Sequence, residues 1–381
     1  MVQLDGLRAV GALLVMAAHW FHIPQRLFDG ALVYLGRVGV LPFFVLSGFL
    51  ITMVLLRVRA KAEAQGIGRR YVLRTFYVRR VLRIVPLYYA ALALGALAGL
   101  PQITSYWPWH LTYLSNVLFS AEGMWPAYVA HFWSLSVEEQ FYLVWPLIVL
   151  FAPRRLLVPL TLGAMALAPL FRGWWVWSGG SPIAAIVLPV GLLDTLGIGA
   201  LLAILMDQGR QSRAVLLRAL RWGTGIGLGG LVGLHVGLAY DVLPTSSWTL
   251  TDTLLAPALA AIVAAGAQGF RGRTGRLLSW GPLVYLGRIS YGLYVFHLLA
   301  MGLVDRGLAW MGWADAFAAW PLAAQAACWF IVTVGLSAGC WHTFEARLHR
   351  LKRYVPYIPS AAAASAKSSA PAATPRVPAS A

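Results

Sequence analysis

Long apolar segments follow one another along this chain, separated by short stretches rich in arginine, glycine or proline. Each segment holds roughly 17 to 25 residues, the length that crosses the hydrocarbon core of a bilayer as an α-helix. Of all residues, 60% are hydrophobic and only 11% are charged, whereas soluble domains average about 25% charged residues. The alternating pattern of a transmembrane β-barrel does not occur. The sequence therefore predicts an all-α, polytopic helical bundle in a membrane.

The distribution of arginine and lysine predicts the number and orientation of the spans. Ten candidate spans begin near Leu7, Leu32, Val81, Val137, Leu156, Ile183, Trp222, Thr253, Leu283 and Pro321. If the N-terminus is cytoplasmic, the cations that fall outside or at the outer end of a span are Arg26, Arg37, Arg172 and Arg306, out of 30. We therefore expect about ten transmembrane helices with both termini in the cytoplasm. The net charge of +17 would face anionic lipid headgroups, so it requires no nucleic-acid partner.

We expect one folded domain, residues 1–355, which contains all the candidate spans. Residues 356–381 form a tail rich in Ala, Ser and Pro, too poor in large apolar groups to pack, and we expect it to be disordered and cytoplasmic. The longest stretch expected outside the membrane runs from Pro101 to about Leu135 and is rich in Trp, Tyr and His. It could meet an extracytoplasmic substrate. We expect no metal site, because no zinc-binding pattern occurs.

The first apolar segment carries two ionisable residues, Arg8 and His19. Eleven residues bring a helix back to nearly the same face, with a separation along the axis of about 16 Å. An ionisable side chain in hydrocarbon is costly, which favours a functional role. The alternative is structural: a histidine that bonds a neighbouring helix and an arginine that anchors a helix entrance. In the expected orientation Arg8 lies at the cytoplasmic edge and His19 lies in the outer half of the bilayer.

A second cationic pair, Arg80 and Arg83, starts the third candidate span. Positions i and i+3 share a helix face, so the two guanidinium groups could grip one polyanionic group such as a pyrophosphate. Ordinary positive-inside anchoring is the alternative. Arg83 lies deeper and closer to Pro86, which makes it the sharper candidate for binding.

Two adjacent carboxylates, Glu138 and Glu139, enter the fourth candidate span from the outer side. Consecutive helical residues point about 100° apart, so we expect at most one of the two to face the bundle interior, and we choose Glu138. The alternative is a helix start, in which Ser134 caps the first turn and the acidic groups favour the positive end of the helix.

The ninth candidate span carries a polar stripe, Ser290, Tyr294 and His297, at positions i, i+4 and i+7. Such stripes often only bond one helix to another. In the sixth candidate span, Asp194 is an acid that should face protein or water.

The expected depths place three of these side chains at one level. His19 lies about 16 Å above the cytoplasmic arginine, Glu138 enters from outside by roughly one turn, and His297 rises about 13 Å from Arg288. This geometry predicts a cavity with a base and a carboxylate near its outer end and an arginine cluster at its cytoplasmic mouth.

Taken in order along the chain, these motifs resemble the acyltransferase-3 group of bacterial membrane O-acyltransferases. The matching pieces are Leu4-Asp5-Gly6-Leu7-Arg8 with His19, Phe43-Phe44-Val45-Leu46-Ser47-Gly48-Phe49, Arg80 and Arg83 with Pro86, Trp133-Ser134-Leu135 with Glu138 and Phe141-Tyr142, Asp194, and Ser290-Tyr291 with Tyr294 and His297. The likeness covers roughly residues 1–350, and the ordered set is specific although each piece alone is weak. Many relatives carry a glutamate two residues before a proline near the end, whereas here Glu345 is followed by Ala346 and Arg347.

The resemblance implies transfer of an acyl group, usually acetyl, from cytoplasmic acyl-CoA to a hydroxyl of a glycan or another polar acceptor. It implies acetyl-CoA as donor substrate, no permanently bound cofactor, and a place in the bacterial cytoplasmic (inner) membrane. Some relatives carry a fused extracytoplasmic hydrolase-like domain, so we expect this chain to act alone or with a separate extracytoplasmic transferase. The site residues implied are Arg8 with His19, Arg80 with Arg83, Glu138, Trp133, Asp194, Ser290, Tyr294 and His297.

In the expected mechanism the CoA head lies against Arg80, Arg83 and Arg8, where charge-assisted bonds to phosphate are strong. Its thin pantetheine arm runs along the face from Arg8 to His19. The thioester would thus reach the outer half of the bilayer without CoA crossing the membrane.

His19 can act as general base on the acceptor hydroxyl or accept the acyl group itself, and both routes stay open. Glu138 would orient the imidazole and stabilise its cation, as a carboxylate does in hydrolase triads. Tyr294 and His297 would donate to the developing oxyanion or line the acceptor path, beside Ser290.

Other functions fit parts of the pattern. The acceptor could be a small secondary metabolite such as a macrolide instead of a cell-surface glycan or a lipid-linked sugar. A transporter or flippase of a polar or lipid-linked substrate would also have about ten spans with polar groups inside the membrane. Such a protein would often show inverted repeats and interrupted helices at corresponding positions, which we do not find in this sequence.

Overall fold

The computed structural model describes residues 2–21 and 35–358, and within these ranges the chain forms helices and no strands. The long helices are α1 (Val2–Trp20), α2 (Leu35–Ala64), α3 (Arg69–Leu97), α7 (Phe132–Phe151), α8 (Leu157–Trp177), α10 (Leu193–Asp207), α11 (Arg210–Ala239), α12 (Thr251–Gln268), α15 (Ser290–Met311) and α17 (Leu322–Cys340). The short α-helices are α4 (Pro101–Thr104), α5 (Trp107–Leu111), α6 (Ser115–Glu122), α9 (Pro182–Val187), α13 (Gly272–Leu278), α14 (Gly281–Arg288), α16 (Ala314–Ala318) and α18 (Ala346–Leu351). Short segments of other helix types are η1 (Arg154–Leu156), η2 (Pro189–Leu192), η3 (Thr245–Leu250), η4 (Trp341–Glu345) and η5 (Lys352–Tyr354).

Nine of the described long helices, all except α1, are long and apolar enough to cross a membrane. Helix α1 has a spanning length of 19 residues, but Gln3, Asp5, Arg8 and His19 lower its mean hydropathy. The chain is therefore a multi-pass membrane protein with a helical bundle. Of the ten expected spans, nine qualify by length and composition, and the first qualifies by length alone.

Several helix boundaries differ from those expected from the apolar segments. Helices α3 and α11 begin about three turns earlier, at Arg69 and Arg210, because arginine and its neighbours there favour helix as well as leucine does. The segment expected to run on from Ile183 is interrupted instead: α9 ends at Val187, and Pro189 starts the turn η2 before α10. Proline cannot donate the backbone bond that a continuous helix would need there.

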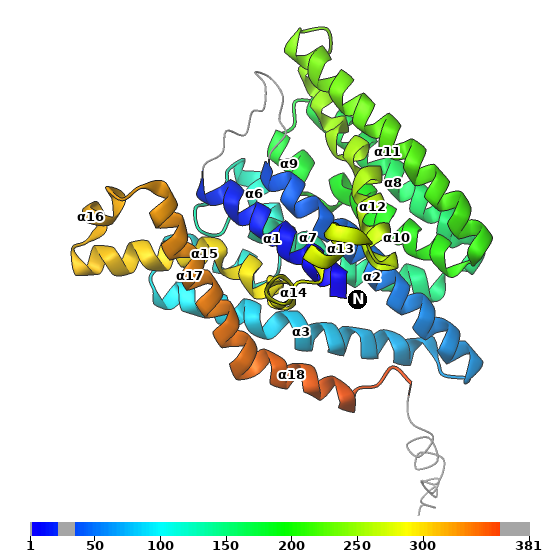
Figure 1. Cartoon of the computed structure of the whole chain (residues 1–381), viewed down its shortest axis with the longest axis horizontal. Helices are drawn as coiled ribbons and strands as arrows, with labels where there is room; N and C mark the ends of the chain where they lie inside the picture. The colour runs from blue at the N-terminus through cyan, green and yellow to red at the C-terminus, as the bar shows by residue number, and fades with distance from the viewer. Residues whose placement is uncertain (1, 22–34, 359–381) are drawn as a thin grey trace, which may run out of the picture.

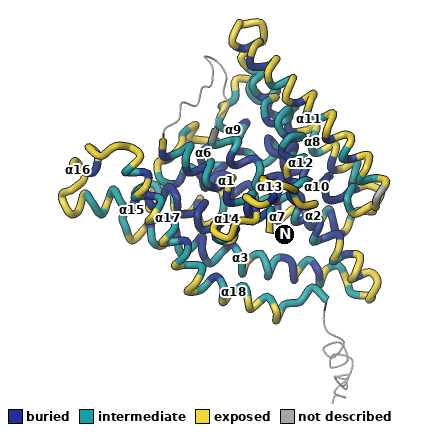
Figure 2. Tube along the Cα trace, viewed as in Figure 1, coloured by how far each residue is buried: buried dark blue, intermediate teal, exposed yellow. Residues whose placement is uncertain are grey.

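The central helices bring together segments that are far apart in the sequence. Figure 1 shows α1 and α2 near the middle, with α8, α10, α11 and α12 on one side and α15, α16 and α17 on the other. Helix α2 packs on α1 and α10, and α1 also packs on α14 and α15. Buried residues concentrate in these central helices (Figure 2), whereas the outer surface exposes large apolar side chains such as Trp310 and Leu97. An apolar outer surface is what contact with lipid requires.

Two glycines allow α2 and α10 to lie in close contact. A Cβ atom at Gly48 would be 2.0 Å from the carbonyl oxygen of Leu196, and one at Gly199 would be 2.0 Å from that of Val45. Small residues permit such close backbone approach between membrane helices, where dispersion replaces the hydrophobic effect as the driving force. Gly48 directly follows Ser47, so this contact also fixes the height of Ser47 in the bundle.

Candidate active site

A cavity of about 100 Å³ lies inside the bundle, where α1, α2, α3, α7 and α15 meet. It has room for about three water molecules. The cavity brings together six of the residues predicted from the sequence: Arg8, Arg80, Arg83, Glu138, Ser290 and Tyr294. Its lining also contains polar residues that were not predicted as site residues: Ser47, Ser134, Glu139, Tyr142 and Tyr291.

Three arginines supply the positive charge of this cavity. Arg8 Nη1 lies 3.2 Å from Asp5 Oδ1, three residues earlier on α1. The guanidinium group of Arg80 lies over the ring of Tyr142, 4.9 Å from its centroid. Within the described part of the chain, Arg80 and Arg83 make no ion pair. Both therefore keep donors for an anionic ligand, as their shared helix face predicts.

A chain of hydroxyl groups leads to the carboxylate of Glu138. Ser47 Oγ donates to Glu138 Oε1 at 2.6 Å, and Tyr142 OH donates to Ser47 Oγ at 2.8 Å. The expected bond from Glu138 to the imidazole of His19 does not occur among the described residues, so this part of the expected mechanism is wrong. Glu138 lies nearly two turns inside α7 and reaches Ser47 on α2, whereas His19 lies near the opposite end of α1 from Arg8.

Glu138 and Glu139 both line the cavity, which corrects the expectation that at most one would face inward. The expectation from the 100° step between neighbouring helical residues assumes that the bundle interior covers only a small angle around the helix. Here the cavity extends from Ser47 on α2 to Arg80 on α3, so it covers a wide arc around α7 and receives both carboxylates. Ser134 is likewise not the cap of α7, because its Oγ donates back to the carbonyl of His131 at 3.0 Å.

Tyr294 marks the boundary between the cavity and a group of histidines. Its hydroxyl oxygen lies 2.5 Å from Ser134 Oγ. Ser134 gives its own hydrogen to the carbonyl of His131, so Tyr294 is the donor in this pair. Its ring also lies 5.6 Å from the ring centroids of both His131 and His297. The hydroxyl of Tyr294 is therefore already engaged with protein, and it would have to turn away from Ser134 to assist an oxyanion.

His19 and His297 meet beyond Tyr294, with ring centroids 5.1 Å apart. The Nε2 atom of His297 lies 3.3 Å from Nδ1 of His19, and Nδ1 of His297 donates to the carbonyl of Tyr294 at 2.6 Å. A neutral imidazole has only one N–H. His297 therefore has no donor left for an oxyanion, which corrects that part of its expected role.

Four predicted site residues do not line the cavity: His19 and His297, described above, and Asp194 and Trp133. Asp194 accepts from Arg172 Nη2 at 2.7 Å and from Thr253 Oγ1 at 2.6 Å. Its buried ion pair joins α8, α10 and α12, which is a structural task. Trp133 packs against Phe44, with ring centroids 5.8 Å apart. Neither residue touches the cavity, because each is satisfied by neighbours that the sequence pattern does not reveal.

Near the end of the described chain, Glu345 closes the π-helical turn η4 and is 7% exposed. Isolated π-helical turns are rare and often occur at functional sites. After this turn the chain docks on α3: Arg79 Nη1 donates to the carbonyls of Lys352 at 2.8 Å and Val355 at 2.9 Å, and Tyr71 OH donates to that of Pro356 at 2.9 Å. Residues 359–381 of the expected tail lie outside the described residues.

Ser47 is the functional candidate that reasoning from single residues missed. A serine in an apolar helix costs little free energy, since its hydroxyl can bond the helix backbone. Its presence alone therefore does not indicate a functional role. The signal available was its position in Phe43-Phe44-Val45-Leu46-Ser47-Gly48-Phe49, where the following glycine predicts close contact with another helix. Tyr142 is similar, because only the fold places it over Arg80.

Proteins with similar sequences are O-acetyltransferases by name. YrhL of Bacillus subtilis (strain 168) is 28% identical over 330 residues, which are 77% of this chain and 47% of YrhL. The peptidoglycan O-acetyltransferase OatA of Listeria monocytogenes is 24% identical over 321 residues, 77% of this chain and 48% of OatA. The O-acetyltransferase OatA of Staphylococcus aureus is 25% identical over 328 residues, 77% of this chain and 49% of OatA. No solved structure matches the chain.

This chain thus spans about half the length of the curated relatives it matches. The family comparison covers far more of the chain itself: the sequence model of the acyltransferase-3 family, described as an acyltransferase domain, matches residues 1–342. These residues contain α1 to α17 and the whole lining of the cavity. The chain therefore belongs to the acyltransferase-3 family.

Proposed function

We propose that this protein is an O-acyltransferase that moves an acetyl group from cytoplasmic acetyl-CoA to a hydroxyl of a cell-surface glycan or lipid-linked sugar. The observation that carries the proposal is the internal cavity with Arg8, Arg80 and Arg83 on its lining. Family membership favours this enzyme over the transporter or flippase alternative. The names of the Listeria and Staphylococcus relatives favour acetyl as the group, and the name of the Listeria relative favours a glycan as the acceptor.

The arginines fit the polyanionic head of CoA. Guanidinium groups bind phosphate through paired, charge-assisted hydrogen bonds that a lysine would not reproduce. The cavity is smaller than a whole acyl-CoA molecule, so only part of the donor would enter it while the rest stays at the mouth. Helix α1 offers the route onward, since Arg8 and His19 lie on one face about 16 Å apart along its axis.

His19 would then act on the thioester in one of two ways. As a general base it takes the proton from the acceptor hydroxyl while the oxygen attacks the thioester carbon; the C–S bond breaks, and the CoA thiolate takes up the proton to leave as free thiol. As an acyl carrier its lone pair attacks first, CoA leaves, and the acceptor oxygen then displaces the imidazole. The products are CoA and an O-acyl ester in both cases.

The orientation of the protein belongs to the same proposal. Both termini would face the cytoplasm of a bacterium, in its inner membrane, because that arrangement places nearly all cations on one side. The acceptor site would then face outward, near the aromatic stretch between α3 and α7. The chain would pass the acyl group to the acceptor itself or to a separate extracytoplasmic transferase.

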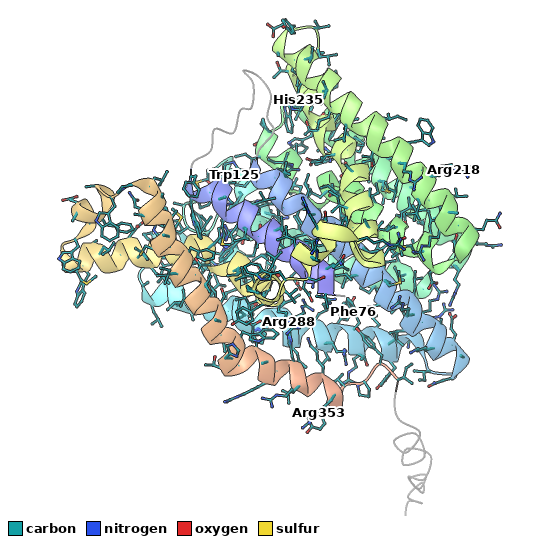
Figure 3. The ribbon with its side chains drawn as sticks, viewed as in Figure 1. Phe76, Trp125, Arg218, His235, Arg288 and Arg353 are labelled. Atoms are coloured by element: carbon teal, nitrogen blue, oxygen red, sulfur yellow. The ribbon has the colours of Figure 1, made fainter. Side chains whose placement is uncertain are left out.

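The test is CoA release from acetyl-CoA by the purified full chain, with soluble peptidoglycan fragments as acceptor. His19→Ala should lower the turnover about 10²- to 10⁴-fold, the usual contribution of a positioned acid or base. His235→Ala is the matched control, because Nδ1 of His235 also bonds the carbonyl four residues earlier, on α11 (Figure 3). Normal turnover by His19→Ala would overturn the role of His19, and failure of the wild-type chain to bind acetyl-CoA would overturn the donor.

In the same assay Arg83→Ala should raise the KM for acetyl-CoA about tenfold or more, since a hydrogen bond to a charged group contributes about 1.5 to 3 kcal/mol. Arg218→Ala is its control, an exposed arginine on α11. An equal loss of donor and acceptor binding in Arg83→Ala would indicate a folding defect and count against a CoA-binding role.

A further inference from the structure

We propose that Nε2 is the reactive nitrogen of His19 and that His297 is its positioning residue, accepting a hydrogen bond from Nδ1–H of His19 in the place that a carboxylate takes in hydrolase triads. The inference deepens the proposed function and rests on the role of His19 in it. It replaces the expected contact between Glu138 and His19, which the fold does not make.

The hydrogen on His19 is fixed by its backbone neighbour. Nδ1 of His19 lies 2.8 Å from the carbonyl oxygen of Val15. A carbonyl can only accept, so Nδ1 carries the hydrogen and Nε2 of the neutral ring carries the lone pair. Among the described residues, Nε2 of His19 makes no hydrogen bond. It is also not one of the fully buried polar atoms that lack a partner, so a reactant can approach it. The basic nitrogen is therefore Nε2.

The same reasoning fixes His297. Its Nδ1 lies 2.6 Å from the carbonyl of Tyr294, so this nitrogen holds the hydrogen and Nε2 is an acceptor. That acceptor lies 3.3 Å from Nδ1 of His19. The N–H of His19 thus lies between two acceptors, the carbonyl of Val15 and the lone pair of His297, and the two rings have compatible tautomers.

The hydrogen bond from His19 to His297 matters most when Nε2 of His19 gains a proton or an acyl group. The ring of His19 then becomes cationic, and its Nδ1–H becomes a stronger donor. Among the described residues the carboxylate of Glu138 makes no bond to this N–H, and the side chain that donates to it is Ser47. His297 is the side chain that meets this N–H, so its lone pair stabilises the charged form more than the neutral form.

Neighbouring groups pack around His297 and anchor its backbone. Trp20 Nε1 donates to its backbone carbonyl at 3.2 Å. The ring of His131 lies 4.6 Å away from that of His297, and Nε2 of His131 donates to the carbonyl of Val295 at 2.9 Å. Burial lowers the pKa of His131 to about 3, so this neighbouring imidazole adds no positive charge beside the cation formed on His19.

Kinetics of His297 variants test the positioning role. His297→Leu removes the acceptor and should lower kcat about ten- to hundredfold, the effect of losing one hydrogen bond to a charged group. The KM for acetyl-CoA should change less than about twofold, since the arginines are untouched. His297→Gln should restore most of kcat, because its Oε1 can take the place of the Nε2 acceptor. His235→Leu should leave both constants at the wild-type values.

A spectroscopic measurement keeps the test independent of turnover. In ¹⁵N-histidine-labelled full-length protein, the signal that disappears in His19→Ala should be that of a ring with hydrogen on Nδ1. A hydrogen on Nε2 would overturn the inference, and so would failure of a folded His297→Gln to recover activity over His297→Leu. If the wild-type chain released no CoA from acetyl-CoA, the proposed function would fail while the tautomer of His19 would still be measured, so the two failures are distinguishable.

Discussion

Ser47 connects three helices through a single hydroxyl group. It donates to Glu138 and accepts from Tyr142, both on α7, and the ring of Tyr142 lies under Arg80 of α3. Each group in this series depends on the next for its orientation, since Ser47 has only one hydrogen to give. A short, neutral side chain therefore couples the carboxylate of the cavity to the arginine expected to hold the donor.

Ser47→Ala should lower kcat/KM for acetyl-CoA about ten- to hundredfold, because it leaves Glu138 and Tyr142 without their partner in a buried site. The free energy of unfolding should also fall, by about 1 to 3 kcal/mol, because Glu138 and Tyr142 each lose a buried hydrogen-bond partner. Ser178→Ala serves as control, because Ser178 Oγ bonds only the carbonyl of Trp175 at an exposed position. Unchanged kcat/KM in Ser47→Ala would show that the hydroxyl series has no part in the reaction.

At this scale the sequence reveals charges more readily than their partners. Arg8, Arg80 and Arg83 stand out because a cation in an apolar segment is costly, and all three line the cavity. The partner of Glu138 was predicted as His19 and is Ser47, because the distance between residues on different helices depends on packing that no local pattern encodes. Asp194 is an equally costly charge in an apolar segment. Its ion pair with Arg172 nevertheless gives it a structural role.

At the scale of helices, hydropathy predicts which segments span the membrane better than it predicts where helices end. The nine apolar spans follow directly from the period and length of the segments. Helix ends depend on local backbone chemistry, as the early start of α3 at Arg69 and the break before Pro189 illustrate. Contacts between helices depend on small residues, and the close approach of α2 to α10 at Gly48 and Gly199 is the clearest case.

Gly48→Ala should lower the apparent Tm and the yield of folded protein, because the new Cβ atom would lie 2.0 Å from the carbonyl oxygen of Leu196 and force α2 away from α10. Overpacking of this kind costs about 1 to 3 kcal/mol. Gly229→Ala on α11 is the control, since a Cβ atom there meets nothing within 4 Å. Thermal unfolding in detergent compares the two variants, and equal stability would contradict close packing of α2 on α10.

Across the whole molecule, the cavity and the histidine pair divide the site in two. The arginines of α1 and α3 lie at one end, and His19 with His297 lies beyond Tyr294 at the other. Charge counting predicts which end faces the cytoplasm, and the spacing along α1 predicts how far the acyl group must travel. The cavity is lined by five helices that are far apart in the sequence, α1, α2, α3, α7 and α15, and only the fold brings them together.

The most direct measurement follows labelled acetyl across a membrane. Inside-out vesicles containing the protein receive [¹⁴C]acetyl-CoA outside, on the face that was cytoplasmic, and peptidoglycan fragments are present both inside and outside. We predict labelled acetyl esters on the enclosed fragments with the wild-type chain and with His235→Ala, and none with His19→Ala. Label confined to fragments on the same side as acetyl-CoA, or equal labelling by His19→Ala, would contradict transfer through the protein from the arginine cavity to His19.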